Sequence, residues 1–262
     1  MVDRQKSIMQ KLRVLALAGV AAIALNACAS PRGAGGGGTA TPDFSGMSNA
    51  AKHAAVQDLG AKYQKSPNKQ SAIYFAAALR AVGQTGQAVS VLEKARLQYK
   101  NDFDVALAYA KALAADGRFD RALNVLDVTI RPERPNWNAL SVKGAIFDQM
   151  GRNAEARTLY NQALVIAPNE PSLYANLGLS FAMSNQLDQA EAALRRAISF
   201  PKASRKVRLN LALVIGLQGR FDGARSIYAR ELPPEDVEAN MAYIRALLTQ
   251  QNKWDRIKGS SN

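Results

Sequence analysis

Cysteine and histidine, whose side chains most often carry metal or nucleophilic chemistry, occur once each in the 262 residues, as Cys28 and His53. A single cysteine allows neither an intramolecular disulfide nor a cysteine-rich zinc site. His53 has no partner at metal-ligand spacing, so we expect an ordinary surface or boundary histidine. Catalysis would have to use carboxylates, lysines or hydroxyls, and no nucleophile, base and orienting group stand out among them. The sequence therefore predicts a protein that is not an enzyme and that takes no metal, cofactor or small-molecule substrate.

Cys28 ends a segment that has the pattern of an export signal. Four basic residues within the first thirteen positions precede an apolar run over residues 14–25, which is too short to span a bilayer comfortably as a permanent helix. The run ends in Leu25-Asn26-Ala27-Cys28, which resembles the lipobox of bacterial lipoproteins. The resemblance implies a signal peptide over residues 1–27 and a covalent lipid such as palmitate on Cys28, which anchors the mature protein to a membrane. An uncleaved anchor and an ordinary secretory signal are the alternatives.

The residues after Cys28 bear on the compartment and on the form of the anchor. In the lipoproteins that this segment resembles, Asp after the cysteine retains the protein at the inner membrane, whereas Ala29 stands here. The resemblance therefore implies the periplasmic face of the outer membrane of a Gram-negative bacterium. Residues 28–48 contain four consecutive glycines and no apolar periodicity, which is typical of a flexible tether. A phosphate-binding loop is disfavoured because no Gly-Lys-Ser/Thr follows the glycines.

Positive charge is the other compositional feature that bears on partners. The chain has 34 Lys and Arg against 21 Asp and Glu, a formal charge of +13. Cleavage after residue 27 would remove four positive charges and one negative charge, and would leave +10. The densest basic segment, residues 202–208, is either a solvated helix end or a site for an acidic partner or phospholipid headgroups. Elsewhere the charge is dispersed, which disfavours nucleic acid as a partner of an exported chain.

A period of 34 residues organises the remainder of the chain without an insertion or deletion over 170 residues. When the sequence is written in rows of 34 residues, so that equivalent positions form columns, the rows begin at Lys69, Phe103, Trp137, Pro171 and Arg205. One column holds Ala88, Ala122, Ala156, Ala190 and Ala224, and five residues earlier stand Gly83, Gly117, Gly151, Asn185 and Gly219. A column of small residues holds Ala76, Ala110, Gly144, Gly178 and Ala212, and a column of large apolar residues holds Leu92, Leu126, Tyr160, Leu194 and Tyr228. This period and pattern resemble the tetratricopeptide repeat.

Helical periodicity supports the same fold. In each row, apolar residues recur at three- and four-residue spacing in two stretches of about thirteen residues, separated by a polar segment. This predicts a helix hairpin, in which Gly or Asn takes the left-handed conformation after the first helix and a polar residue caps the second. One hairpin cannot bury its own apolar face, so we expect five hairpins to stack. The fold class is all-α, and the resemblance implies a right-handed superhelix with a concave inner surface.

The pattern also predicts the ends of the array. We expect an N-terminal capping helix within residues 49–68, five repeats over residues 69–238, and a C-terminal capping helix and tail over residues 239–262. Helical periodicity covers residues 49–64, and a closing helix from Glu235 to about Trp254 follows two prolines. Terminal helices with a polar outer face keep a stacked array soluble.

In proteins with this repeat, the first helix of each hairpin lines the concave groove. The resemblance implies a partner-binding groove formed by Tyr74, Arg80, Lys111, Asp148, Asn176, Leu179, Met183, Lys206, Asn210 and Leu213. Such amide, cationic and aliphatic groups suit an extended peptide, because amides bond to its backbone while Leu and Met accept its side chains. Some proteins with this repeat use lysine and asparagine side chains to clamp the C-terminal carboxylate of a peptide. The resemblance does not extend to this clamp, since Ser141 and Ala145 stand where it requires Lys and Asn.

The layout of the whole chain adds a further resemblance. A lipobox signal, a glycine tether and five to six repeats that end in a helix with Met241-Ala242-Tyr243-Ile244-Arg245 and Trp254 resemble the repeat lipoproteins of the tight-adherence (Tad/Flp) pilus apparatus. The resemblance implies a scaffold for protein partners, among them a secretin or other subunits of the apparatus. A pilotin-like lipoprotein of another secretion system, an adaptor for peptidoglycan or outer-membrane protein assembly enzymes, and an enzyme with a repeat domain are the alternatives.

Overall fold

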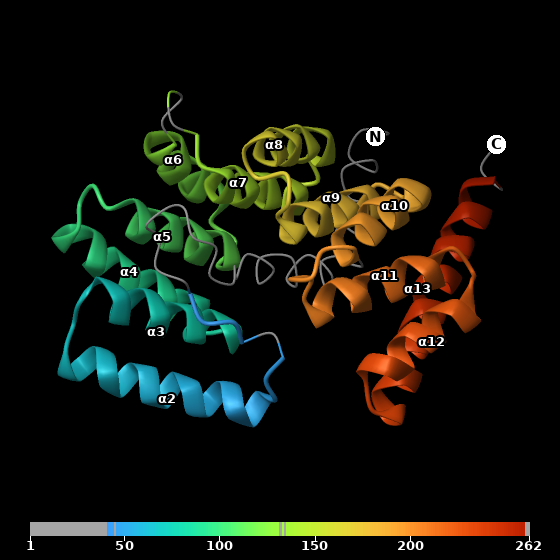
Figure 1. Ribbon diagram of the computed structural model, residues 1–262, viewed down its shortest axis with the longest axis horizontal. Helices are drawn as coiled ribbons and strands as arrows, with labels where there is room; N and C mark the ends of the chain where they lie inside the picture. The colour runs from blue at the N-terminus through green and yellow to red at the C-terminus, as the bar shows by residue number, and fades with distance from the viewer. Residues whose placement is uncertain (1–40, 45, 131–132, 134, 260–262) are drawn as a thin grey trace. The chain divides into compact units, whose positions relative to one another are not determined.

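The structure is a computed structural model that describes residues 41–259, apart from 45, 131–132 and 134. The predicted signal peptide over residues 1–27, Cys28 and most of the predicted tether lie outside the described residues. The described chain forms two compact units, an N-terminal unit that ends at residue 169 and a C-terminal unit that begins at residue 170. Its regular secondary structure consists of twelve helices without a strand (Figure 1).

Five helix hairpins follow the predicted period. The first helices begin at the first residue of each row, and they are α3 (Lys69–Ala81), α5 (Phe103–Ala115), α7 (Trp137–Gln149), α9 (Pro171–Met183) and α11 (Arg205–Leu217). The second helices are α4 (Thr85–Gln98), α6 (Phe119–Thr129), α8 (Asn153–Ile166), α10 (Leu187–Ile198) and α12 (Phe221–Glu231). The predicted all-α fold and its 34-residue hairpins are therefore confirmed.

One further helix lies at each end of the hairpins. Helix α2 (Asn49–Lys65) packs on α3, and α13 (Pro234–Gly259) packs on α11 and α12. Pro234 is the first residue of α13, a position where the missing N–H costs no helical hydrogen bond. Helix α13 therefore begins inside the fifth row. Among the described residues, no helix is long and apolar enough to cross a membrane.

Side chains of the last residue in a row cap the following first helix. Asp102 accepts hydrogen bonds from the backbone N–H groups of Asp104 and Val105, and Asn136 does the same for Asn138 and Ala139. Asn68 and Glu170 cap α3 and α9 in the same way, whereas Ser204 forms no such bond. These caps satisfy N–H groups that have no carbonyl partner within the helix.

The prediction that a polar side chain caps the second helix is wrong. The residue before each second helix, for example Arg118 or Gln186, has ψ near 60° rather than extended geometry, and it forms no side-chain cap bond. Its backbone N–H instead donates to a carbonyl of the preceding helix, 2.8 Å for Arg118 to Leu113. This tight turn requires positive φ at the glycine column, and Asn185 adopts it with φ 59°. The turn therefore satisfies the N–H of the residue before the second helix and a carbonyl of the first helix, and no side-chain cap forms there.

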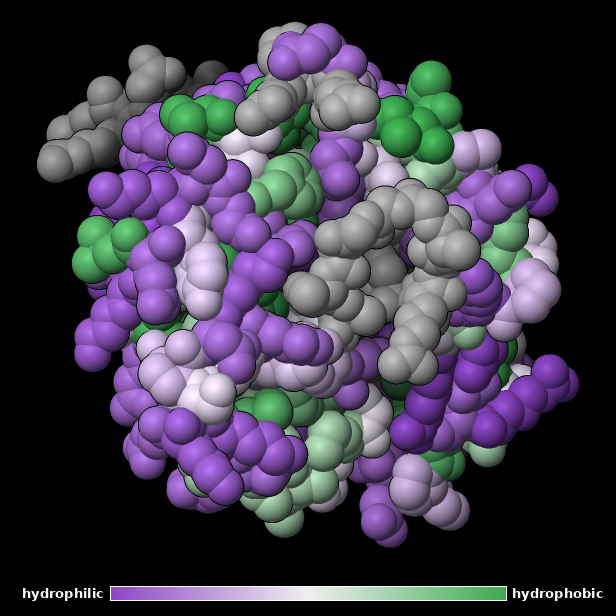
Figure 2. Space-filling view, turned by 60° about the vertical axis from the view of Figure 1, so that its left-hand side comes forward, coloured by the Kyte–Doolittle hydropathy of each residue, from purple (hydrophilic) through white to green (hydrophobic). Residues whose placement is uncertain are grey.

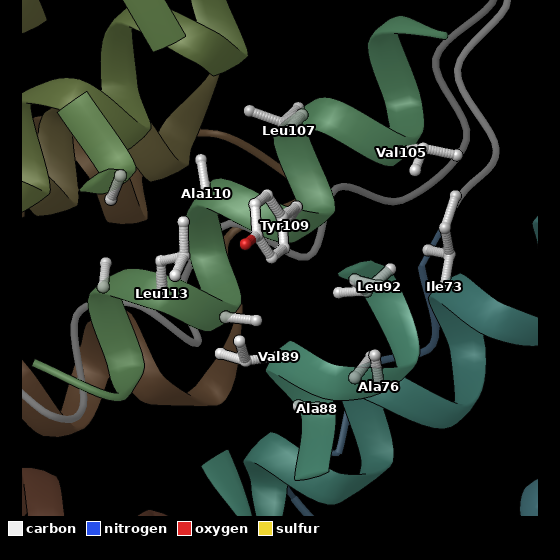
Figure 3. Packing of buried hydrophobic residues seen from close by; sticks show 14 of the residues in the cluster. Ile73, Ala76, Ala88, Val89, Leu92, Val105, Leu107, Tyr109, Ala110 and Leu113 are labelled. Atoms are coloured by element: carbon white, nitrogen blue, oxygen red, sulfur yellow. The ribbon is translucent and has the colours of Figure 1, made fainter. Parts of the chain in front are cut away.

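The columns of the repeat meet inside the hairpins. All five members of the alanine column are fully buried, and so are Leu92, Leu126 and Leu194 of the large apolar column. At Gly144, an added Cβ would lie 2.7 Å from a ring carbon of Tyr160, and at Gly178 it would lie 2.7 Å from Leu194. Figure 3 shows how Ala76 of α3, Ala88 and Leu92 of α4, and Tyr109 and Leu113 of α5 fill the interior of the N-terminal unit. Small residues thus allow the paired helices to approach closely.

Candidate functional site

The predicted groove residues of the N-terminal unit lie on three first helices. Lys111 of α5 is 8% exposed, and its Nζ lies 3.5 Å from the Oδ1 of Asn138, on the next first helix, α7. This contact brings positions 9 and 2 of neighbouring repeats together. Tyr74 of α3 is half-buried and accepts a hydrogen bond from Gln70, one turn earlier, at 2.8 Å. Arg80, at the end of the same helix, is also half-buried.

Asp148 has a different environment from the other predicted groove residues. It is 4% exposed, and its Oδ2 accepts a hydrogen bond from the hydroxyl of buried Tyr160 at 2.8 Å. Its Oδ1 accepts from the amide of Asn153 at 2.7 Å. Both partners belong to α8, the second helix of the same hairpin. The carboxylate therefore joins the two helices of its hairpin, which gives Asp148 a role in packing.

The other six predicted residues lie on α9 and α11, two first helices that contact each other in the C-terminal unit. They are Asn176, Leu179 and Met183 on α9, and Lys206, Asn210 and Leu213 on α11. Asn176 and Leu179 are no more than 2% exposed, and Asn210 is 7% exposed. Met183, Lys206 and Leu213 are half-buried. The accessible part of this candidate groove thus combines one cation with two apolar side chains, while its two amides are buried.

Much of the basic segment 202–208 is engaged inside the C-terminal unit. Glu231, at the end of α12, accepts a hydrogen bond from Arg208, and its carboxylate also lies 3.9 Å from the guanidinium of Arg205. The hydrogen bond from Arg208 lowers the pKa of Glu231 and raises that of Arg208. The Arg208 guanidinium also donates to the Ala203 carbonyl at 3.3 Å. These contacts favour a structural role for two of the four cations in the segment.

A second carboxylate of the C-terminal unit joins two hairpins. Glu191 of α10 accepts a hydrogen bond from Arg220, just before α12, and another from Arg195, one turn later on α10, at 2.8 Å. The side chain is 15% exposed, whereas both arginines are about half exposed. The hydrogen bond from Arg220, followed by that from Arg195, outweighs burial and lowers the pKa of Glu191 from 4.5 to about 2.

Exposed apolar side chains are scattered over the second helices. The large ones are Leu97, Val128, Val165 and Ile166, together with Tyr243 of α13. Figure 2 shows hydrophobic residues in small groups that are separated by hydrophilic ones on the face drawn there. Within the described ranges, no cluster of three or more His, Cys, Asp or Glu side chains has the arrangement to hold a metal ion. The exposed apolar side chains are therefore interspersed with polar ones on the face drawn in Figure 2.

Stacked helix hairpins with side chains presented from successive first helices define a repeat scaffold for protein recognition. Family models agree: models described as tetratricopeptide repeat match residues 79–143 and 206–230, and one described as TPR repeat matches residues 144–185. The uncharacterized protein y4yS of Sinorhizobium fredii is 35% identical over 135 residues, which are 52% of this chain and 70% of that protein. The chain belongs to the tetratricopeptide-repeat family, whose repeat domains are typically non-catalytic and bind protein partners.

Solved structures share the fold. The chain resembles TTC0263, a tetratricopeptide-repeat protein of Thermus thermophilus, with a TM-score of 0.59 and 23% identity over 68% of this chain and 98% of that one. A tetratricopeptide-repeat protein from Parabacteroides merdae resembles the chain with a TM-score of 0.54 and 16% identity. The match covers 78% of this chain and 81% of that one. The human protein O-mannosyl-transferase TMTC1 is 21% identical over 154 residues, which are only 18% of its length. At these identities the likenesses concern the repeat fold.

The side-chain network of the third hairpin was missed at the level of sequence, although the sequence carries a signal for it. Tyr160 stands in a column where three rows have leucine and the fifth has Tyr228, and Asp148 stands in a column that elsewhere holds arginine, alanine or glycine. The third row alone combines a tyrosine in the first column with a carboxylate in the second. Two polar replacements in one hairpin, on facing helices, indicate a pair. Comparison of the columns would have indicated this pair. Assignment of groove residues by their position in the repeat does not compare columns, so it missed the pair.

Proposed function

We propose that this chain is a lipid-anchored scaffold at the periplasmic face of the outer membrane, where it binds protein subunits during assembly of a Tad/Flp-type pilus apparatus. Its role would be the assembly or localisation of the secretin. The observation that supports the binding function is the contact between the first helices α9 and α11, on which Met183, Lys206 and Leu213 are half-buried. The lipobox and the layout of the chain support the anchor and the choice of system.

The chemistry of these two helices suits an extended peptide segment of a partner. The Lys206 ammonium adds a positive charge to this surface, which suits backbone carbonyls or an acidic side chain of a partner. Met183 and Leu213 are partly accessible, and a flexible thioether beside a leucine adapts to apolar side chains of different shape. Recognition of this kind uses a few anchor residues, so changes at two positions are enough to test it.

Replacement of Lys206 and Leu213 by alanine is expected to reduce capture of the protein partners by at least about tenfold, a loss of about 1.4 kcal/mol of binding free energy. Both side chains project from α11 and are only half-buried, so the array should remain folded. The measurement is a pull-down from detergent-solubilised membranes, quantified by mass spectrometry, with circular dichroism as the test of folding.

The matched control is Ile227→Ala with Arg230→Ala, which also removes one aliphatic group and one cation from the C-terminal unit, but on the second helix α12. This control should retain the partners. If the α11 variant retains every partner and the α12 variant loses them, the binding surface belongs to the second helices and the proposed groove is wrong. Captured secretin and pilus subunits would favour the Tad/Flp system, whereas peptidoglycan or outer-membrane assembly enzymes would favour the adaptor alternative.

Replacement of Cys28 by serine is expected to abolish lipidation and to release the protein from the outer-membrane fraction, because no thiol remains for acylation. The measurement is membrane fractionation after metabolic labelling with a palmitate analogue. Ala29→Asp is the companion variant: it keeps the thiol and should move the labelled protein to the inner membrane. Unchanged outer-membrane fractionation of the serine variant would contradict the anchor.

A further inference from the structure

A cleft of about 490 Å³ lies on the N-terminal unit. It is bounded by the second helices α4 and α6, with Tyr109 of α5 between them. Its lining includes the cations Arg96, Lys100 and Arg121, the carboxylate Glu93, and the exposed side chain of Leu97. Three positive charges against one negative charge give the cleft an excess of positive charge.

Hydrogen bonds across the base of the cleft hold part of this lining in place. The Arg121 guanidinium donates to the Tyr109 hydroxyl at 2.9 Å, and that hydroxyl donates to Glu93 at 3.2 Å. Arg121 also pairs with Glu93 at 3.3 Å. Burial, and then the nearby Glu93 charge, raises the pKa of Tyr109, so its phenol stays protonated near neutral pH. The single carboxylate is therefore engaged by Arg121 and Tyr109.

Arg96 and Lys100 are the cations that remain for a ligand. The Arg96 guanidinium lies over the Tyr109 ring, 5.0 Å from its centroid, and forms no ion pair with any described residue. Lys100 is exposed and, within the described part of the chain, has neither a hydrogen bond nor an ion pair. Stacking on an aromatic ring orients the guanidinium and leaves its N–H edge able to bond to a carboxylate.

The repeat pattern indicates that Arg96 is not required by the fold. The equivalent positions of the other four hairpins hold aliphatic residues, Ile130, Leu164, Ile198 and Leu232, each half-buried. An arginine in this column places a charge where packing calls for a hydrocarbon. Leu97, the next residue, is 72% exposed, so this cleft has an apolar side chain in solvent next to Arg96.

We propose that this cleft is a second docking site, which binds an acidic peptide segment of a protein partner. A carboxylate of the segment would lie between Arg96 and Lys100, and a neighbouring aliphatic side chain would lie against Leu97. The two cations favour an acidic ligand by charge complementarity. The exposed leucine favours a peptide over a simple anion, because a peptide also has apolar side chains that can pack on it. This inference goes beyond the proposed function, because it needs neither the lipid anchor nor the groove of α9 and α11.

The test is the affinity of the full chain in detergent for a fluorescein-labelled peptide with the sequence Asp-Glu-Leu-Asp-Glu-Leu, measured by fluorescence anisotropy. The double variant Arg96→Leu with Lys100→Ala should bind this peptide at least about tenfold more weakly. Leucine at position 96 restores the residue type of the other hairpins, so the variant should keep its thermal unfolding midpoint. The control Lys65→Ala with Lys94→Ala removes the same charge from exposed positions of α2 and α4 outside the cleft, and it should bind normally.

Three results would overturn the proposal. Equal losses in the cleft variant and the control variant would show binding by net charge alone. Equal affinity for the neutral peptide Asn-Gln-Leu-Asn-Gln-Leu would show that carboxylates do not contribute to binding. Displacement of the acidic peptide by an equal concentration of inorganic phosphate would show a site for a small anion. Because none of these measurements uses the α11 variant or Cys28, failure here leaves the proposed function standing.

Discussion

Replacement of Asp148 by alanine should lower the free energy of unfolding by about 2–4 kcal/mol, as measured by urea denaturation at pH 7. The carboxylate accepts hydrogen bonds from Tyr160 at 2.8 Å and from Asn153 at 2.7 Å. Tyr160 is 1% exposed, so its hydroxyl cannot turn to water when the acceptor is removed. A buried hydroxyl that loses its carboxylate acceptor costs more than the lost bond contributed.

A double-mutant cycle separates this pair from a general loss of packing. Tyr160→Phe removes only the hydroxyl and should cost about 1 kcal/mol, because Asn153 still bonds to the carboxylate. The double variant should be more stable than the sum of the two single losses predicts, with a coupling energy of at least about 1 kcal/mol. Additive losses would contradict the pairing. The folded fraction of Asp148→Ala should retain its protein partners, since the carboxylate faces its own hairpin.

Replacement of Glu191 by glutamine should cost about 2 kcal/mol of unfolding free energy at pH 7 and progressively less as the pH falls towards 2. The pKa of Glu191 falls from 4.5 to about 2 on folding, mainly through the hydrogen bond from Arg220. A lowered carboxyl pKa means that the ionised form is bound more tightly in the folded state. The stabilisation is therefore complete above about pH 5 and is lost between about pH 5 and pH 2. Solvent around the half-exposed arginines screens the pair, so the cost stays below the full value of the shift.

The measurement is urea denaturation of the natural chain and the Glu191→Gln variant at pH 7 and pH 3. Glu235→Gln on α13 is the control, because Glu235 is exposed and forms no ion pair with the described residues. The control should change stability by less than about 0.5 kcal/mol at either pH. A Glu191→Gln cost that is equal at both pH values would contradict ionic stabilisation and would assign the effect to packing.

The ends of the helices show which features of the fold can be predicted from the local sequence pattern. Rows that begin at Lys69 and Trp137 predict where α3 and α7 begin, because helix starts depend on nearby apolar spacing and on the cap residue that precedes them. The glycine column predicts the positive φ after each first helix, and Asn185 adopts the same conformation. The second helices show where this reasoning fails: the pattern predicts a polar side-chain cap, but Arg118 and its equivalents form none, and their backbone N–H groups bond to carbonyls of the preceding helix.

The partners of side chains depend on how the helices pack, which the local sequence pattern does not contain. Family positions assign Lys111 and Asp148 to the groove but do not give their partners. The structure joins Lys111 to Asn138 of the next repeat, and Asp148 to the second helix of its own hairpin. The stacking of Arg96 on Tyr109 joins helices α4 and α5. Each of these outcomes depends on the distance between two helices and on rotamers, which a linear period does not contain.

The sequence by itself determined the helical fold, the 34-residue hairpins and the buried alanine and leucine columns, because helix periodicity and turn chemistry are local properties of the chain. The tertiary structure alone decided which polar groups are used inside the array and which face solvent. It engages Asp148, Glu191 and Glu231 in contacts between helices, and it leaves Arg96 and Lys100 in an open cleft. The physical reason is that a polar side chain gains its partner across a helix interface, at a distance that only the packed backbone sets.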